Sequence, residues 1–320
     1  MNYNSLNAYL RNQYGEKVYK LALNGGMTCP NRDGTLDTRG CIFCSLGGSG
    51  EFAESITIGQ MSGYAETTVR LAEEDVIRRL EAAKQRLSGK KTGTQYIAYF
   101  QAYTNTYAPV EYLRSLFLPI LGREDIVGIS IGTRPDCLPE DVLELLDEMN
   151  RVKPVWVELG LQTIHEDTAK LIRRGYELPC FDHAVTELRK RHIDVIVHLI
   201  FGLPGEGKAD MIESVHYVNQ SQVQGVKFQL LHILQETDLA DLYAQQKELV
   251  RPLTMEEYID ILCDAVENLS PDIVIHRMTG DGPKKLLIAP MWSADKKRVL
   301  NAIRQEFVHR DICQGRALSV

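Results

Sequence analysis

The stretch DVIVHLIFGLPGEGKADMIESVHYVNQ, residues 194–220, contains one complete strand, loop and helix. Its beginning is an apolar run rich in β-branched residues, which predicts a buried strand over 194–201. The glycine-rich loop GLPGE follows, and residues 208–220 then carry apolar side chains at helical spacing. A strand followed directly by a helix predicts a right-handed crossover to a parallel neighbouring strand.

The same alternation continues along the chain. Further buried strands are predicted at 17–23, 94–100, 126–131, 155–159, 225–231 and 273–276. Helical spacing is found at 73–87, 110–121, 140–149, 181–192, 255–269 and 294–308. We therefore expect an α/β protein with a partial (β/α)6 TIM-like barrel over 1–235 and a short C-terminal α/β extension over 236–320, in one compact unit. A doubly wound sheet is the alternative.

Polar or glycine-rich segments follow the predicted strands. After the first strand comes a loop with three cysteines, and the later strands end in QAYTNT, GTRPDC, ELGLQT, GLPGE and HILQET. In (β/α) barrels the site lies where strands end and the loops to the helices begin. We therefore expect these segments to surround one functional site.

Composition and charge restrict the class of protein. The 320 residues are 44% hydrophobic, which is enough for a large core, and no apolar run is long enough to span a membrane. The start of the chain lacks the pattern of a secretion signal, so we expect a cytoplasmic protein without a membrane partner. The net charge of −7 argues against a nucleic-acid module with a uniformly positive surface.

The charge is unevenly distributed. Residues 272–320 contain nine Lys/Arg and five Asp/Glu, a net of +4, which leaves −11 for residues 1–271. This excess of cations predicts either an ordinary solvated basic helix or a docking surface for a polyanion.

Three of the seven cysteines lie in LNGGMTCPNRDGTLDTRGCIFCSLGGSGEF, residues 23–52, with the spacing C-x11-C-x2-C. A structural zinc site needs four ligands, and closing one here would require a remote residue such as Cys137, which is otherwise an inert thiol. A thioredoxin-like pair would leave Cys29 unexplained. Three thiolates suit a [4Fe–4S] cluster with one iron open to an exogenous ligand, on Cys29, Cys41 and Cys44.

This motif resembles that of the radical S-adenosylmethionine (SAM) superfamily and, within it, the YtqA/YhcC-type proteins. More distantly, the sequence is similar to oxygen-independent coproporphyrinogen dehydrogenase and to the catalytic subunit of Elongator. The superfamily resemblance covers about residues 17–235, and the narrower one includes RMTGDGPKKLLIAPMW at 277–292. The first cysteine gap of eleven differs from the commonest superfamily spacing of three, and such long first gaps are typical of the Elongator-like branch that the sequence resembles.

The resemblance implies an enzyme with an oxygen-sensitive [4Fe–4S] cluster and SAM as cofactors. The amino and carboxylate groups of SAM would chelate the open iron. An electron, from a donor of the flavodoxin or ferredoxin type, would then cleave SAM to methionine and a 5′-deoxyadenosyl radical. The cofactors supply this step, and the protein orients them.

The resemblance also assigns SAM contacts. Phe43 would lie near the adenine, with a core phenylalanine as the ordinary alternative. Arg174 would bind the carboxylate, or Arg173 in its place, unless both are helix-surface cations. His198 would meet the ribose, although a lone histidine on a buried strand is more often a satisfied core residue. The other predicted SAM contacts are Tyr103, Thr104, Thr133, Glu158, Gln162, Gly202, Leu203 and Pro204.

The substrate is predicted from the Elongator-like spacing together with the basic C-terminal part. Both favour tRNA, with a radical modification of the C5 side chain of the wobble uridine, of the carboxymethylaminomethyl type. The alternatives are a small metabolite such as a tetrapyrrole and a non-enzymatic iron–sulfur or zinc protein. Phosphate contacts and one stacking aromatic are predicted among His276, Arg277, Lys284, Lys285, Trp292, Lys296, Lys297 and Arg298.

Overall fold

In the computed structural model, eight parallel strands form one curved sheet. The structure describes residues 2–48, 50–56, 63, 70–86, 93–280 and 282–318. The order in the sheet is β2 (Glu54–Ser55), β1 (Tyr19–Asn24), β3 (Tyr96–Phe100), β4 (Ile126–Thr133), β5 (Val155–Gln162), β6 (Asp194–Phe201), β7 (Gly225–Leu230) and β9 (Val274–Arg277). Within the described residues the two edge strands, β2 and β9, do not pair with each other.

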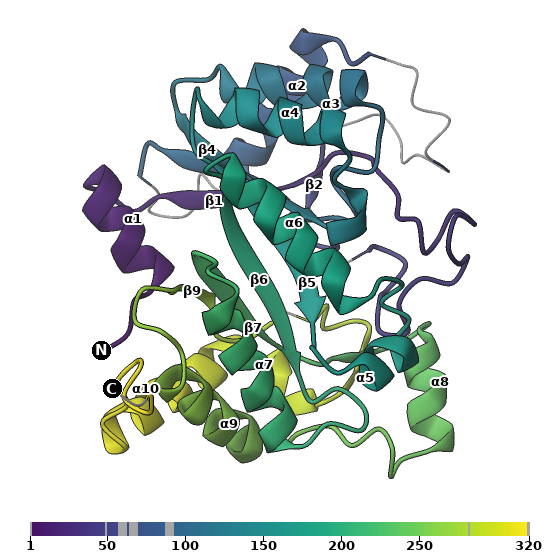
Figure 1. Ribbon diagram of the computed structural model, residues 1–320, viewed down its shortest axis with the longest axis vertical. Helices are drawn as coiled ribbons and strands as arrows, with labels where there is room; N and C mark the ends of the chain where they lie inside the picture. The colour runs from purple at the N-terminus through teal and green to yellow at the C-terminus, as the bar shows by residue number, and fades with distance from the viewer. Residues whose placement is uncertain are drawn as a thin grey trace.

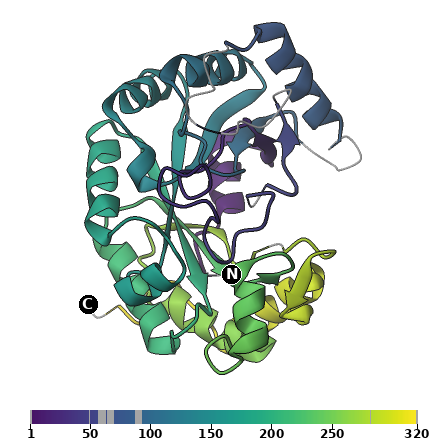
Figure 2. The same cartoon turned by 90° about the vertical axis from the view of Figure 1, so that its right-hand side faces the viewer.

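Helices surround the outer face of this sheet, and Figure 2 shows them as an arc around the strands. They are α2 (Glu73–Gln85), α3 (Val110–Leu121), α4 (Glu140–Asn150), α5 (Glu166–Leu171), α6 (Leu178–Lys190), α7 (Lys208–Gln220) and α9 (Met255–Glu267). On α3, Leu113, Leu116, Phe117 and Ile120 are completely buried at helical spacing, which is the face that packs on the sheet.

The topology confirms the predicted partial barrel. From β1 onward the strands follow chain order across the sheet, apart from the two-residue β2 at one edge. A doubly wound sheet would reverse its order at a switch point, so that alternative is wrong. All seven strands and seven helices predicted from the sequence are present, with ends shifted by a few residues.

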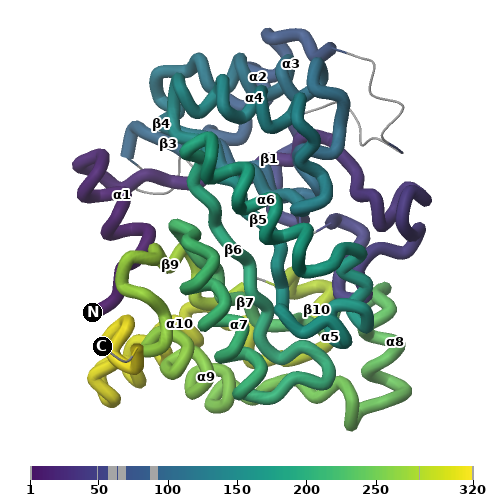
Figure 3. The backbone as a smooth tube through the Cα atoms, in the orientation of Figure 1, coloured from purple at the N-terminus to yellow at the C-terminus, as the bar shows by residue number. Residues whose placement is uncertain are grey.

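The C-terminal part adds to the same sheet and packs beside it. β9 pairs with β7 in parallel, while β8 (Ile233–Leu234) and β10 (Leu287–Ala289) form a separate antiparallel pair. The remaining elements are α1 (Leu6–Tyr14), α8 (Asp238–Gln245), α10 (Lys296–His309) and the short 3₁₀ turns Pro135–Cys137 and Met291–Ala294. Figures 1 and 3 show the two ends of the chain close together, and Gln314 N donates to Asn2 O at 2.9 Å. The domain boundary at residue 235 stays a prediction.

Among the described residues, no helix is long and apolar enough to cross a membrane.

Candidate active site

A pocket of about 490 Å³ is lined by the cysteine loop and by residues of β1, β3, β4, β5, β6, β7 and β9. It brings together thirteen of the residues predicted from the sequence, from segments far apart in the chain. These are Cys29, Cys41, Phe43, Cys44, Tyr103, Thr104, Thr133, Glu158, Gln162, Arg174, His198, His276 and Arg277.

The three cysteines of the loop are free thiols that line this pocket. Burial raises the pKa of Cys41 to about 12, and the nearby Cys44 adds to the effect. Their sulfurs do not all lie within 4.8 Å of one another. A tetrahedral zinc ion with Zn–S bonds of about 2.3 Å would bring its sulfur ligands to about 3.8 Å. The spacing therefore fits a larger group with several irons better than one ion.

Two side chains that the sequence analysis missed hold the cysteine loop. Arg32 Nη2 donates to the carbonyl oxygens of Cys44 at 2.8 Å and Ser45 at 2.6 Å. Asn31 Nδ2 lies 3.5 Å from Cys41 Sγ and donates to Arg173 O at 2.8 Å. Hydrogen bonds and positive charge beside cluster sulfurs stabilise their negative charge and influence the reduction potential.

Tyr103 fastens the same loop from the end of β3. It has a positive φ of 57°, its backbone N donates to Gly48 O at 2.8 Å, and its hydroxyl donates to Leu46 O. A Cβ atom on Gly48, whose φ is +58°, would come within 2.4 Å of the Tyr103 ring. Only glycine fits at this close approach, so Tyr103 and Gly48 together fix the last part of the loop.

Deeper in the pocket, the completely buried carboxylate of Glu158 is the centre of a polar network. It accepts from Lys20 Nζ at 2.8 Å, Ser130 Oγ at 2.6 Å and His198 Nε2 at 2.8 Å, and it also pairs with Lys227. Burial alone would raise the pKa of Glu158, but Lys20 and Lys227 outweigh burial and hold it well below the usual value. Glu158 is therefore a permanent anion in this network.

His198 is fixed by two partners. Besides its bond to Glu158, its Nδ1 lies 3.2 Å from Gln229 Nε2, so Nδ1 accepts and Nε2 carries the proton. Burial, with Lys227 nearby, lowers the pKa of His198 to about 4. The imidazole is thus neutral near pH 7, and both of its nitrogens are already occupied by protein groups.

Arg174 has a different environment from the one predicted. Its side chain is 2% exposed, and its guanidinium donates to the carbonyl oxygens of Tyr176 at 3.0 Å and Thr163 at 2.7 Å. It also pairs with Glu166 at 3.0 Å. A bidentate contact with the carboxylate of SAM would require at least one of these bonds to break. The protein therefore holds Arg174 tightly although this residue lines the pocket, and its role toward SAM stays a prediction.

Two other arginines near Arg174, Arg173 and Arg134, also have protein partners in place of an open contact for the carboxylate of SAM. Arg173 pairs with Asp238 at 2.6 Å and does not line the pocket. Arg134, which the sequence analysis missed, does line the pocket, but its fork holds Asp136 through Nε at 2.9 Å and Nη2 at 2.7 Å.

Comparison with known proteins shows the family to which this chain belongs. The sequence profile of the radical SAM superfamily matches residues 38–218, and that of the radical SAM C-terminal domain matches residues 223–309. The chain belongs to the radical SAM superfamily. It is an enzyme of this class, and its cofactors are a [4Fe–4S] cluster and SAM.

The relatives of this radical SAM enzyme include two full-length matches. The chain is 45% identical to the uncharacterized protein YtqA of Bacillus subtilis, over 98% of this chain and 92% of the relative. It is 35% identical to protein YhcC of Escherichia coli, over 90% of this chain and 86% of the relative. The solved structure of Elp3 from the archaeon Methanocaldococcus infernus superposes with a TM-score of 0.65 at 16% identity, over 93% of this chain and 64% of that one. This last likeness concerns the fold.

In a radical SAM enzyme the bound cluster supplies the electron that cleaves SAM. Cys29, Cys41 and Cys44 would hold the cluster here, and Arg32 and Asn31 would keep the loop around it in place. Cys137 is buried, lies 3.7 Å from Asp136 Oδ1 and does not line the pocket, so it is not placed to be a fourth ligand.

Gln162 offers the clearest open contact for SAM. It has a positive φ of 65° at an irregularity in the pairing of β5 with β6, and its side chain lines the pocket. Its Oε1 is buried and has no hydrogen-bond partner in the part of the chain that the structure describes. A buried acceptor without a donor is costly, and an ammonium or hydroxyl group of SAM would satisfy it. The pocket thus fits the cofactor at this residue.

The other predicted SAM contacts differ in whether they line the pocket and in whether their polar groups already have hydrogen-bond partners. Phe43 lines the pocket with its half-buried ring. The hydroxyl of Thr133 lies 2.5 Å from that of Thr106, and Thr104 N donates to Thr28 O at 3.2 Å, so these polar groups already have partners. Gly202 and Leu203 lie in the β6–α7 loop outside the pocket lining. Their roles toward SAM stay predictions.

The predicted substrate residues separate into two groups. His276 and Arg277 line the pocket, and the exposed Lys284 and Lys285 follow Pro283, which also lines it. Lys296, Lys297 and Arg298 are exposed on the first turn of α10, away from the pocket lining.

Trp292 is not an exposed stacking platform. It is half-buried, its ring packs 5.8 Å from that of Tyr258, and its Nε1 donates to Leu253 O at 2.9 Å. The protein therefore covers part of this ring, and the base-stacking role of Trp292 stays a prediction.

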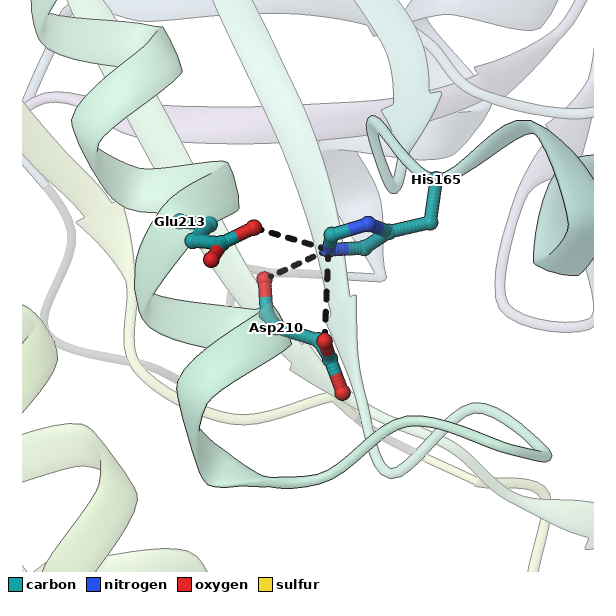
Figure 4. A group of neighbouring side chains, drawn as sticks. All are labelled: His165, Asp210 and Glu213. Carbon is teal, nitrogen blue, oxygen red and sulfur yellow. Dashed lines mark hydrogen bonds and ion pairs between the residues drawn. The ribbon is translucent and has the colours of Figure 1, made fainter.

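One further group of metal-ligating side chains lies at the start of α7. Figure 4 shows His165 with Asp210 and Glu213, and its Nε2 is 4.0 Å and 3.9 Å from their carboxylates. The same nitrogen lies 3.0 Å from the carbonyl oxygen of Asp210, to which it must donate. A protonated Nε2 has no lone pair for a metal, so this group holds the helix start in place.

Proposed function

We propose that this radical SAM enzyme acts on tRNA and modifies the C5 side chain of the wobble uridine, in a carboxymethylaminomethyl-type remodelling. The observation that carries the proposal is a pair of exposed lysines that directly follows two pocket-lining residues in the chain. Gly282 and Pro283 line it, and the exposed Lys284 and Lys285 follow directly. A basic rim beside the pocket supports a substrate with phosphates around the reacting base.

The geometry suits a nucleoside from a single-stranded loop. A pocket of about 490 Å³ is in the range of small-ligand sites and is lined by polar groups from most strands of the barrel. Unpaired bases of an anticodon loop can be turned outward into such a pocket, while the stem remains outside. The rest of the chain is acidic, so phosphates would be attracted to the basic segment and repelled elsewhere.

The resemblance of the sequence to the Elongator catalytic subunit supports the same substrate class. Acetyl transfer is not part of the proposal. We further propose a cytoplasmic enzyme that receives electrons from a flavodoxin- or ferredoxin-type donor, since tRNA and such donors are found there.

The test is an anaerobic reaction of cluster-loaded protein with SAM, reductant and total tRNA, followed by nucleoside analysis. We expect one uridine derivative to be consumed and another to form, with production of 5′-deoxyadenosine. The Cys44→Ala protein is the control for chemistry that does not need the cluster. If no nucleoside changes while SAM is still cleaved, the proposal fails and a small metabolite becomes the leading substrate class.

A further inference from the structure

The deep part of the pocket contains more basic than acidic side chains. Lys20, Lys227 and Arg277 line it, and the one acidic side chain among them is Glu158. In the strand register, Lys227 of β7 lies opposite Arg277 of β9 on one side and opposite His198 of β6 on the other. Adjacent strands therefore present two cations side by side toward the same space.

The two lysines already have partners, whereas Arg277 has none among the residues that the structure describes. Lys20 Nζ lies 2.8 Å from Glu158 and 3.3 Å from Ser130 Oγ, and Lys227 Nζ bonds Glu158 and, at 3.0 Å, the hydroxyl of Tyr99. No hydrogen bond or ion pair to any described residue engages the half-buried guanidinium of Arg277. Its donors are thus available to a ligand in the pocket.

Positive charge exceeds negative charge among these buried and half-buried side chains. Burial lowers the pKa of Lys20 and the pKa of Lys227, and Arg277 pushes both in the same direction despite Glu158. Burial, Lys20 and Lys227 also lower the pKa of His276 well below its usual value. Glu158 can balance one positive charge of the three, so an added anion would relieve the repulsion among them.

We propose that Lys20, Lys227 and Arg277 form an oxyanion site inside the barrel that binds a carboxylate at the reacting end of the substrate. The inference rests on the proposed function for the source of this carboxylate, which is the C5 side chain of the uridine. An arginine fork suits a carboxylate because it can donate two parallel hydrogen bonds. The two lysines, fixed by Glu158, place further positive charge beside it.

The cations of this site differ from those beside the cysteines that would hold the cluster. The charged neighbours of Cys41 and Cys44 are Arg134, Arg32 and Glu51. Those of Lys227 are Glu158, Lys20 and Arg277. The pocket therefore has one set of cations at the cysteine loop and a second set deep in the barrel.

The test compares two anticodon stem-loop RNAs. One carries 5-carboxymethylaminomethyluridine at the wobble position, and the other carries the methyl ester of the same side chain, which lacks the charge. Binding is measured anaerobically at fixed salt with cluster-loaded protein and SAM. We expect the carboxylate RNA to bind about 10- to 100-fold more tightly, the range for hydrogen bonds to a charged group.

The variants test whether Arg277 causes this preference. In Arg277→Gln the affinity ratio of the two RNAs should fall close to one, and in Arg277→Lys part of it should return. Arg189→Gln, which removes an exposed cation from the outer helix α6, should keep the full ratio. Because each ratio is taken within one protein, a general loss of stability cannot imitate the result.

The outcomes separate this inference from the proposed function. If the parent modifies the RNA but does not distinguish carboxylate from ester, or if Arg277→Gln keeps the preference, the oxyanion site is refuted and the tRNA function stands. If neither RNA binds, the tRNA proposal fails. The oxyanion site is then judged with acetate, read by the fluorescence of Trp156, whose ring lies 5.2 Å from Lys20 Nζ, in a Trp292→Phe background. A saturable change that Arg277→Gln abolishes supports it, and no change refutes it.

Discussion

His198 Nε2 donates to Glu158 Oε2 at 2.8 Å, and the two residues lie on neighbouring strands of the barrel. The bond fixes a neutral imidazole beside a buried carboxylate, among Lys20, Lys227, His276 and Arg277. A histidine that must stay neutral in the folded protein makes stability depend on pH, and the direction follows from its pKa.

The free energy of unfolding should decrease as the pH falls from 6.5 toward 4. The pKa of His198 is about 4 in the folded protein against 6.5 for an ordinary histidine, so the unfolded chain binds more protons in this window. The contribution is complete above pH 6.5 and is lost below it, by at most about 1.4 kcal/mol per pH unit. Urea unfolding at pH 7.5, 6.5 and 5.5, on chelator-treated protein, measures it.

His198→Gln is the matched control, because glutamine can still donate to Glu158 and does not titrate. Its stability should depend less steeply on pH over the same window. Equal slopes for the parent and the variant would show that the pKa of His198 is not lowered.

Replacing any one of Cys29, Cys41 and Cys44 by alanine should abolish SAM cleavage. Anaerobically reconstituted parent protein should contain about four iron per chain and should make 5′-deoxyadenosine slowly even without substrate. Cys137→Ala should keep iron and activity, since this thiol lies outside the pocket lining. Iron and sulfide analysis with a cleavage assay checks this. Stoichiometric zinc without iron would contradict the assignment of the cluster.

Arg174→Ala should destabilise the fold by about 2–4 kcal/mol. The substitution leaves Glu166 and several backbone carbonyl oxygens without their donor, and unpaired buried polar groups have costs of this size. Equilibrium unfolding measures the loss. A variant that is as stable as the parent but binds SAM weakly would return Arg174 to the cofactor contacts predicted from the sequence.

Gln162→Ala should weaken SAM binding about tenfold without loss of the cluster. Gln162 Oε1 is a buried acceptor without a donor among the described residues, and one such hydrogen bond contributes about 1–1.5 kcal/mol. Gly160→Ala should act in the same direction, because its Cβ would come within 2.7 Å of Gln162 Nε2 and displace the side chain. Calorimetric titration with SAM is the measurement. Unchanged affinity in both variants would remove Gln162 from the site.

Lys284 and Lys285 should contribute more to tRNA binding than Lys296 and Lys297. The first pair follows the pocket lining directly, and the second pair lies on α10. The double alanine variant of the first pair should lower the affinity and reduce the slope of log K against log salt by about one for every phosphate that the protein no longer neutralises. If both pairs have equal effects, the basic segment acts through general attraction alone.

The order of strands and helices could be predicted because the apolar pattern that identifies each element lies within its own residues. β6 is an apolar run and α7 has helical spacing, so neither depends on distant residues for its recognition. α1 was missed because it is short and mostly polar, although Ser5 and Gly15 at its ends are typical capping residues.

Site residues could be predicted only where they belong to a short sequence motif. The cysteine spacing indicates three candidate cluster ligands, whereas the partners of Arg174 and Trp292 come from tertiary packing that no local pattern encodes. Lys20 and Lys227 had a weak signal, since each is a lysine within an otherwise apolar strand. Their meeting at Glu158 depends on how the sheet curves, which the sequence does not state.

The attachment of the cysteine loop to a distant part of the chain has a consequence for biogenesis. Ile42 N donates to Ile172 O at 3.2 Å, and Cys41 Sγ lies 3.4 Å from Arg173 O, which follows it by 132 residues. While the ribosome is still making β4, the cysteines have been synthesised but the residues that shape their loop have not. Unlike a zinc finger, whose ligands and fold are local, this chain can present a finished binding site to the iron–sulfur delivery machinery only after more than half of it has emerged.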